Sequence, residues 1–117
     1  MSEIFDIQSV PGRGNTTILR ARGRLEAHSA SGLLARCAEV RKSGRNLVLN
    51  LSEVTFIASS GVGALLAMLE EYRQSRLQVR VAAASPAVDS VVRLLNLQEF
   101  IVMNPTEDEA EADLEAA

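Results

Sequence analysis

The chain has 117 residues, which is enough for a single domain that buries about two thirds of its unfolded surface without disulfides or bound metal. Hydrophobic residues make up 47% of it and aromatic residues only 3%, which is typical of a globular protein and argues against stacking platforms for single-stranded nucleic acid. Cys37 is the only cysteine and His28 the only histidine, so an internal disulfide is excluded, and neither a zinc site nor a histidine-based catalytic triad is expected. We therefore expect a protein without metal, cofactor or enzymatic activity.

The formal net charge of −3 is divided unevenly along the chain. Residues 106–117 hold six acidic residues and no basic ones, which leaves nine acidic and all twelve basic residues, a net of +3, for residues 1–105. The basic residues are scattered and the acidic segment would repel phosphates, so we expect no nucleic-acid binding. We interpret residues 1–105 as the domain and residues 106–117 as an acidic tail, either a marginal helix with Leu114 as its only large apolar residue or a disordered segment.

No run of 18 apolar residues is present, and the N-terminus lacks the basic and apolar regions of a secretion signal. The sequence therefore predicts no membrane insertion. A reduced Cys37 suits the cytoplasm, which is the expected location.

The first part of the chain predicts a hairpin. Residues 4–10 alternate loosely and are expected to form an edge strand, and a Pro-Gly-Arg-Gly turn follows at residues 11–14. Residues 16–25 are predicted to form a second strand. Three arginines project from it at period two and are interpreted as facing solvent or a partner: Arg20, Arg22 and Arg24.

A helix is predicted next, with Ser29 or Ser31 as its N-cap and Gly44 just beyond its end. Its apolar stripe consists of Ala30, Leu33, Leu34, Cys37 and Ala38. Residues 46–51 then form the apolar run expected of a strand covered on both faces, and a loop is predicted at residues 52–58.

Two adjacent serines, Ser59 and Ser60, stand where strand periodicity changes to helical periodicity. The helix predicted from about residue 60 to 75 carries an apolar stripe of Val62, Leu65, Leu66 and Leu69. A serine before a helix most often only caps it. One hydroxyl is enough for a cap, so the other is free to lie beside the unpaired amides of the helix start, which favour negative charge. Gly61 and Gly63 carry no side chains, which either lets a partner or a phosphate approach the backbone at the helix start or lets the helix pack closely on the sheet.

The rest of the chain predicts a strand at residues 77–81, a helix, and a short last strand at residues 100–103. Ser85 and Pro86 have the pattern of an N-cap followed by proline at the first helical position. The apolar stripe of that helix is Val88, Val91, Val92 and Leu95.

The predicted order is ββαβαβαβ. Such alternation indicates an α/β fold, a single domain with a mixed, mostly parallel sheet of four or five strands and helices packed on it. The first strand is expected to be antiparallel at one side of the sheet. In these sheets the functional loops lie beyond the carboxyl ends of the strands, which is where Ser59 and Ser60 follow the central strand.

Residues 47–66 read Leu-Val-Leu-Asn-Leu-Ser-Glu-Val-Thr-Phe-Ile-Ala-Ser-Ser-Gly-Val-Gly-Ala-Leu-Leu. This resembles the signature of STAS domains (sulfate transporter and anti-sigma factor antagonist), in particular the free-standing bacterial antagonists. The family pattern is an apolar strand ending in Asp/Asn-Leu, a short loop, an Asp-Ser-Ser/Thr-Gly box and a glycine-containing helix. Residues 23–26 resemble the family's Gly-Glu-Leu-Asp turn and residues 84–88 its Ser-Pro segment, so the resemblance covers about residues 4–103.

The resemblance implies that Ser59 is phosphorylated by a partner anti-sigma factor, which is an ATP-dependent serine kinase. The unphosphorylated protein would bind that partner and free the sigma factor, the phosphorylated form would release the partner, and a serine phosphatase would reset the switch. The chain departs from the family pattern at Ala58, where the family has an acidic residue before the serines. Arg24 also replaces an acid, whereas Glu26 keeps the charge of one with an additional methylene.

The implied partner surface gathers around Ser59 and comprises Arg24, Glu26, Ala58, Ser60, Gly61, Val62, Gly63, Ala64 and Met68. Ala64 and Met68 lie off the main stripe of their helix, one turn apart. They either form a small exposed patch beside the serines or widen the buried face. An alternative function keeps the fold and removes the switch: a STAS subunit or scaffold of a larger assembly, such as a lipid ABC transporter or a sensory complex.

Overall fold

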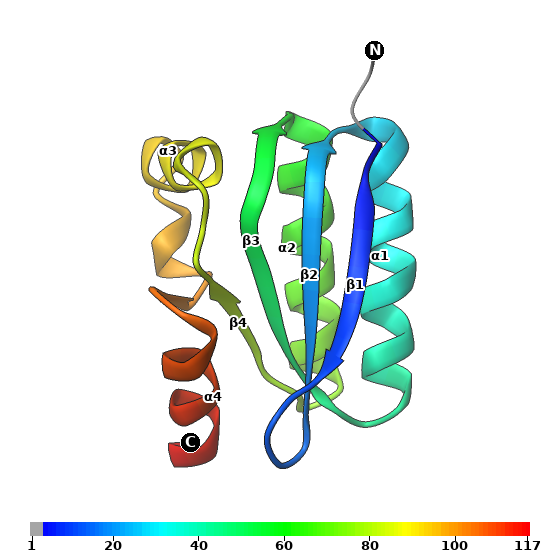
Figure 1. Ribbon diagram of the computed structural model, residues 1–117, viewed down its shortest axis with the longest axis vertical. Coiled ribbons are helices and arrows are strands. Elements are labelled where there is room, and N and C mark those ends of the chain that lie inside the picture. The colour runs from blue at the N-terminus through cyan, green and yellow to red at the C-terminus, as the bar shows by residue number, and fades with distance from the viewer. Residues whose placement is uncertain (1–3) are drawn as a thin grey trace.

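Within residues 4–117, which the computed structural model describes, five β-strands form one sheet and four α-helices pack against it (Figure 1). The strands are β1 (Asp6–Pro11), β2 (Thr16–Leu25), β3 (Asn46–Ile57), β4 (Val79–Ala82) and β5 (Met103–Asn104). The helices are α1 (Ala27–Lys42), α2 (Ser59–Gln74), α3 (Pro86–Leu94) and α4 (Glu107–Ala116), with a short 3-10 helix η1 (Leu97–Glu99) after α3. No helix in this described part is long and apolar enough to cross a membrane.

The strands lie in the order β1-β2-β3-β4-β5, with β3 at the centre. β1 runs antiparallel to β2, and every other neighbouring pair is parallel. Parallel neighbours need crossover connections, which α1, α2 and α3 provide. The predicted α/β fold, with its mixed sheet and ββαβαβαβ order, is therefore confirmed, and α4 follows the last strand.

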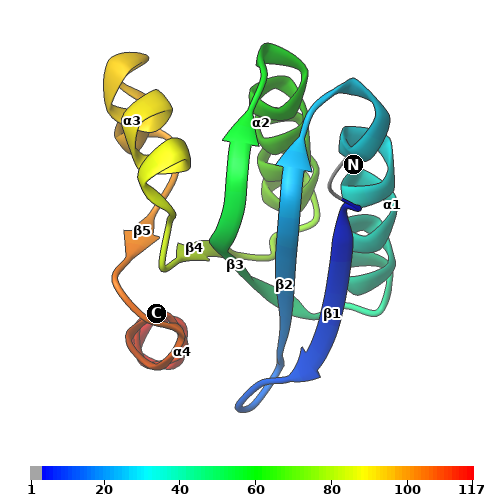
Figure 2. The same cartoon turned by 45° about the horizontal axis from the view of Figure 1, so that its top comes forward.

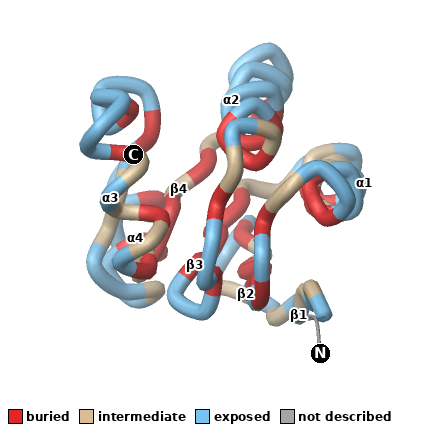
Figure 3. Tube along the Cα trace, turned by 90° about the horizontal axis from the view of Figure 1, so that it is seen from above, coloured by how far each residue is buried: buried red, intermediate tan, exposed pale blue. Residues whose placement is uncertain are grey.

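α1 and α2 cover one face of the sheet, and each turns its buried side toward the strands (Figure 3). Leu47 and Leu49 of β3 point into this layer and are fully buried. Because side chains alternate along a strand, Val48 points to the opposite face, which we call the outer face, and is buried there. Burial on both faces accounts for the continuous apolar run of the central strand.

A buried hydrogen bond ties the two helices together. The Tyr72 hydroxyl of α2 donates to the Cys37 carbonyl oxygen of α1 at 2.6 Å. Burial raises the pKa of the Cys37 thiol to about 12, and it also raises the pKa of the Tyr72 phenol. Cys37 is therefore a protonated core residue, as its place on the apolar stripe predicts.

β3 is longer than predicted, because it continues through the segment that was expected to be a loop. Its register against β2 shifts between Arg20 and Arg22 and again between Gly23 and Arg24, with one extra β3 residue at each shift. Such bulges interrupt the alternation of apolar and polar residues that marks a strand. The sequence of this segment therefore looks like a loop although it pairs with β2.

The predicted N-caps of the first helix are wrong. α1 begins at Ala27 with Glu26 as its N-cap, two residues or more before either serine. The Ser29 hydroxyl accepts the Glu26 backbone N–H at 3.0 Å and donates to the Arg24 carbonyl oxygen at 2.6 Å, while Ser31 is exposed. Ser29 therefore fastens the helix start to the end of β2 from inside the first turn.

The last strand is also shorter than predicted, since only Met103 and Asn104 pair with β4. The backbone N–H groups of Phe100 and Ile101 both donate to the Leu97 carbonyl oxygen, at 2.8 and 2.9 Å. These local bonds close η1 and keep the two amides out of the sheet. Phe100 is 68% exposed as a result.

The acidic segment forms α4, which lies beside β4 and β5, apart from α1 and α2 (Figure 2). Thr106 caps it by accepting the Glu109 backbone N–H at 3.1 Å. On the outer face a small cluster buries two α4 residues against three strand residues: Ile18, Val48, Ala82, Ala110 and Leu114. Of the two forms considered for this segment, the structure has the helix, which tertiary contacts stabilise.

Candidate functional site

Ser59 is the first residue of α2, directly beyond the carboxyl end of the central strand β3. It is exposed, and Ser60 beside it is half-buried. Neither hydroxyl forms a hydrogen bond with another residue of the described range 4–117. The fold therefore makes no use of the Ser59 hydroxyl, which another protein can reach.

α2 begins without a capping side chain. Its N-cap is Ala58, in extended backbone, whereas Ser85 caps α3 and Thr106 caps α4 through their hydroxyl oxygens. The reading in which Ser59 or Ser60 only caps the helix is therefore wrong, because both lie after the N-cap. The first amides of α2 have no intrahelical acceptor, so they present unpaired N–H groups and partial positive charge next to Ser59.

The two glycines of this helix start have different surroundings. A Cβ at Gly61 would lie 2.8 Å from the Leu25 carbonyl oxygen and 3.0 Å from Cγ1 of Ile57. The same Leu25 oxygen accepts the Ala58 backbone N–H at 2.9 Å. Gly61 thus lets α2 pack closely on the ends of β2 and β3. At Gly63 an added Cβ would have nothing within 4 Å among the described residues beyond its chain neighbours and the adjacent backbone of α2, so this glycine leaves the helix surface without a side chain.

A charged and aromatic surface flanks this edge of the sheet. Arg24 Nε lies 2.8 Å from Glu26 Oε2, and the Arg24 guanidinium carbon lies 4.2 Å from the centroid of the Phe56 ring. Arg24 and Phe56 are paired residues of β2 and β3. Sequence reasoning missed Phe56, which is 38% exposed, because only the second bulge of β3 brings it beside Arg24. No local sequence signal marks this pairing.

Three residues predicted to bind a partner are buried in the main core instead: Val62, Ala64 and Met68, at 8%, 6% and 2% exposure. The exposed patch considered for Ala64 and Met68 is wrong. α2 packs against α1 as well as β3, so its buried face must be wider than a single stripe. Leu66, on the predicted stripe, is 37% exposed.

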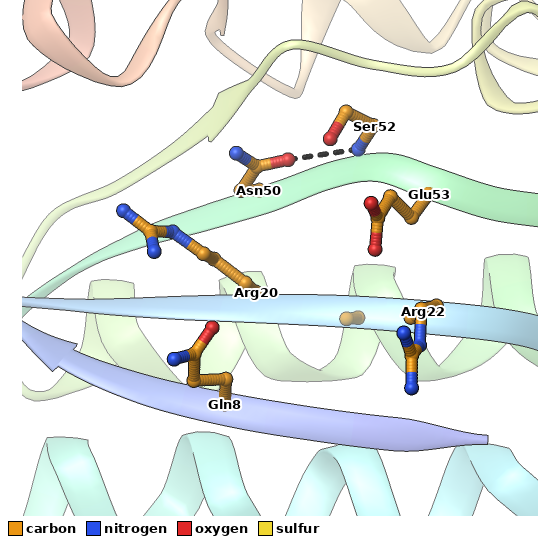
Figure 4. Close-up of a pocket in the computed structure, with 7 residues that line it drawn as sticks. Gln8, Arg20, Arg22, Asn50, Ser52 and Glu53 are labelled. Carbon is orange, nitrogen blue, oxygen red and sulfur yellow. Dashed lines mark hydrogen bonds between the residues drawn. The ribbon is translucent and has the colours of Figure 1, made fainter.

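A separate polar hollow of about 260 Å³ lies on the outer face of β1, β2 and β3 (Figure 4). Its lining consists of Gln8, Arg20, Ala21, Arg22, Asn50, Ser52 and Glu53. Arg20 and Asn50 both bind the Glu107 carboxylate of α4, at 2.8 and 2.7 Å. The hollow is therefore continuous with the α4 contact and is distinct from the Ser59 edge. Across residues 4–117 no group of three or more His, Cys, Asp or Glu side chains is placed to hold a metal ion.

Comparison with known proteins agrees with this geometry. A sequence model of the STAS domain family matches residues 8–110. The fold is similar to that of an anti-sigma factor antagonist from Mycobacterium paratuberculosis, with a TM-score of 0.87 and 22% identity over 98% of this chain and 99% of that one.

Two further similar structures are of SpoIIAA, an anti-sigma factor antagonist and Bacillus cell fate determinant. The unphosphorylated form has a TM-score of 0.78 and 23% identity over 96% of this chain and 98% of that one. The phosphorylated form has a TM-score of 0.69 and 23% identity over 90% and 96%. At these identities the structures establish the fold. Because the family match spans most of the chain, including β3 and Ser59, the chain belongs to the STAS domain family.

Proposed function

We propose that this protein is an anti-sigma factor antagonist that acts by partner switching in the bacterial cytoplasm. In the unphosphorylated form it binds an anti-sigma factor that is a serine kinase, and the sigma factor is released. Phosphorylation of Ser59 abolishes this binding, and a serine phosphatase restores it. The observation that carries the proposal is the exposed Ser59 hydroxyl, which has no partner among residues 4–117. The similarity in fold to SpoIIAA, which has been solved in unphosphorylated and phosphorylated forms, supports it.

The surroundings of Ser59 suit a phosphate. A phosphoserine carries about −1.5 to −2 charge near neutral pH, and the uncapped amides at the start of α2 favour negative charge at that place. The fold should therefore tolerate the modification. Phosphorylation should instead weaken partner binding, because a partner that fits the unmodified start of α2 would clash with the phosphate group and be repelled by its charge.

The proposed contact surface around Ser59 consists of three exposed residues, Arg24, Phe56 and Gly63, and three half-buried ones, Glu26, Ala58 and Ser60. The Arg24–Glu26 ion pair leaves that surface without net charge, and Ala58 and Phe56 add apolar area. Gly61 and Val62 are buried, so they would support the contact surface indirectly by letting the start of α2 pack against the sheet. The proposed partner accordingly presents a neutral, partly apolar surface.

To test the proposal, the protein is incubated with ATP and its cognate serine kinase, and its intact mass is measured by mass spectrometry. We expect one added phosphate, absent from Ser59→Ala and retained in Ser60→Ala, which is the matched control. Phosphorylation should weaken binding to the kinase by about 100-fold, or about 2.7 kcal/mol. A phosphate on another residue, or equal binding of both forms, would refute the switch.

Ala58 favours a second candidate, because it removes the acidic residue that the family pattern has beside the serine. This candidate is a non-switching STAS subunit or scaffold of a larger assembly, such as a lipid ABC transporter or a sensory complex. It predicts no phosphate on Ser59 and a stable complex with transporter or sensory components on pull-down.

A further inference from the structure

The apolar contact under α4 is separate from the main core. On the outer face, Ile18, Val48 and Ala82 come from three neighbouring strands and are covered by α4. α4 contributes only two buried apolar side chains, Ala110 and Leu114, whereas α1 and α2 bury broad faces in the main core. Apolar burial therefore holds α4 less firmly than the other two helices.

Arginines of the sheet bind the acidic side chains of α4. Arg20 Nε and Nη2 contact the two carboxylate oxygens of Glu107 at 2.8 and 2.9 Å, and Asn50 adds a hydrogen bond at 2.7 Å. Arg80 Nε contacts Asp113 Oδ2 at 2.5 Å. A two-point contact between arginine and carboxylate orients its partner as well as attracting it. The sheet thus holds the first turn and the later part of α4 by charge.

The turn between β1 and β2 provides the third arginine. The Arg13 guanidinium lies 2.8 Å from Asp108 and 3.3 Å from Glu115, and its backbone N–H donates to the carboxylate of Glu111. Among the described residues of α4, Glu109 is the one acid that pairs with no arginine. Charge therefore fastens α4 along its whole length.

The surface beneath α4 is an apolar strip bordered by three arginines. Any helix with a narrow apolar stripe between acidic residues would find the same contacts there. The polar hollow of Figure 4 extends this surface beyond Glu107, and its lining carries one side chain of each charge there, Arg22 and Glu53. The fit is one of charge and shape, and α4 is one occupant that satisfies it.

We propose that this outer surface is a docking site for an acidic amphipathic helix of a partner protein, and that α4 occupies it in cis until the partner helix replaces it. Charge complementarity selects the occupant, because three arginines of the body face five carboxylates of α4. Each of these ion pairs includes one side chain that is at least 43% exposed, so solvent and salt screen the pair, and one acidic helix can exchange for another. The site is distinct from the Ser59 edge and does not depend on the proposed switch.

The direct test uses a fluorescent peptide with the sequence of residues 105–117 as the probe and the full chain as the receptor. Leu114→Glu places a carboxylate in the apolar strip and so releases the chain's own α4. We expect this variant to bind the peptide about tenfold or more tightly than the unaltered chain, whose site is occupied. Adding Arg80→Gln should weaken that binding, whereas adding Arg93→Gln, which removes an exposed ion pair of α3, should not change it.

Two further measurements guard against misfolding of the variant. Far-ultraviolet circular dichroism checks that Leu114→Glu keeps its fold. In the unaltered chain, hydrogen exchange should show residues 107–116 opening faster than β3, and faster still when NaCl is raised from about 50 to about 500 mM. If a folded Leu114→Glu chain fails to bind the peptide at low salt, or if α4 exchanges only together with β3 at both salt concentrations, the docking proposal is overturned.

Discussion

Replacing Gly61 by alanine tests how closely α2 approaches the sheet beside the proposed phosphorylation site. The added methyl would lie 2.8 Å from a backbone oxygen, that of Leu25, and 2.9 Å from Cγ of the same residue. Leu25 is fully buried at the end of β2 and cannot turn away without moving the strand. Gly63→Ala, two residues along the same helix, is the matched control, because an added methyl meets no described atom within 4 Å beyond its chain neighbours and the adjacent backbone of α2.

The expected magnitudes follow from two opposing terms. Alanine is about 1 kcal/mol more favourable than glycine inside a helix, so Gly63→Ala should raise the free energy of unfolding by up to that amount. Gly61→Ala gains the same helical preference but adds the cost of overpacking, about 1–3 kcal/mol, and should be neutral or destabilised by up to about 2 kcal/mol. The two variants should therefore differ by about 1–3 kcal/mol although they make the same chemical change.

Urea denaturation followed by far-ultraviolet circular dichroism measures this difference. Both variants should unfold in one transition with the slope of the unaltered protein, so that the shift in midpoint reports stability. If Gly61→Ala proves as stable as Gly63→Ala, the close contact between α2 and β2 is not as described, and the argument that Gly61 supports the site from beneath fails with it.

Three further outcomes can be measured on the same protein. Met68→Glu should lower the free energy of unfolding by on the order of 3–5 kcal/mol and abolish the helical circular dichroism, because it buries an unpaired charge. Ala67→Glu, at the exposed neighbouring position, should remain folded. A folded Met68→Glu chain would show that this position is not part of the core. Burial raises the pKa of the Cys37 thiol to about 12 and keeps reagents away from it, so a disulfide reagent should label it only after unfolding. Rapid labelling of the native chain would disprove its burial. The pKa of Glu107 lies below its ordinary value of 4.5, because Arg20 hydrogen-bonds the carboxylate. The contribution of Glu107 to stability is therefore present above pH 4.5 and is lost as the pH falls through the folded pKa. Glu107→Gln should make the free energy of unfolding less dependent on pH in that acidic range, and an unchanged pH dependence would argue against the Arg20 contact.

Local patterns in the chain were enough to predict most of the elements. Alternation and helical spacing located four strands and three helices, and Ser85 followed by Pro86 correctly marked the start of α3. They failed where the chain departs from regular geometry. The bulges of β3 interrupt its alternation, so that residues 52–57 were predicted as a loop although they belong to the strand. Phe100 and Ile101 were predicted in the last strand, but their backbone N–H groups bond to Leu97 instead.

The position of Ser59 at the carboxyl edge of the central strand follows from the order of elements, since the first residue of a helix that directly follows a strand lies at the carboxyl end of that strand. That its hydroxyl is unused does not follow from the chain alone. It depends on Ala58 being the N-cap, which the length of β3 and its bulges determine.

The burial of Met68 and the docking of α4 depend in the same way on contacts between residues far apart in the chain. Periodicity shows that a helix has an apolar side, but how wide that side must be depends on which elements pack against it. An acidic segment that would be marginal in isolation becomes an ordered helix because arginines from β2, β4 and the β1–β2 turn converge beside it, and only the folded sheet brings those three together.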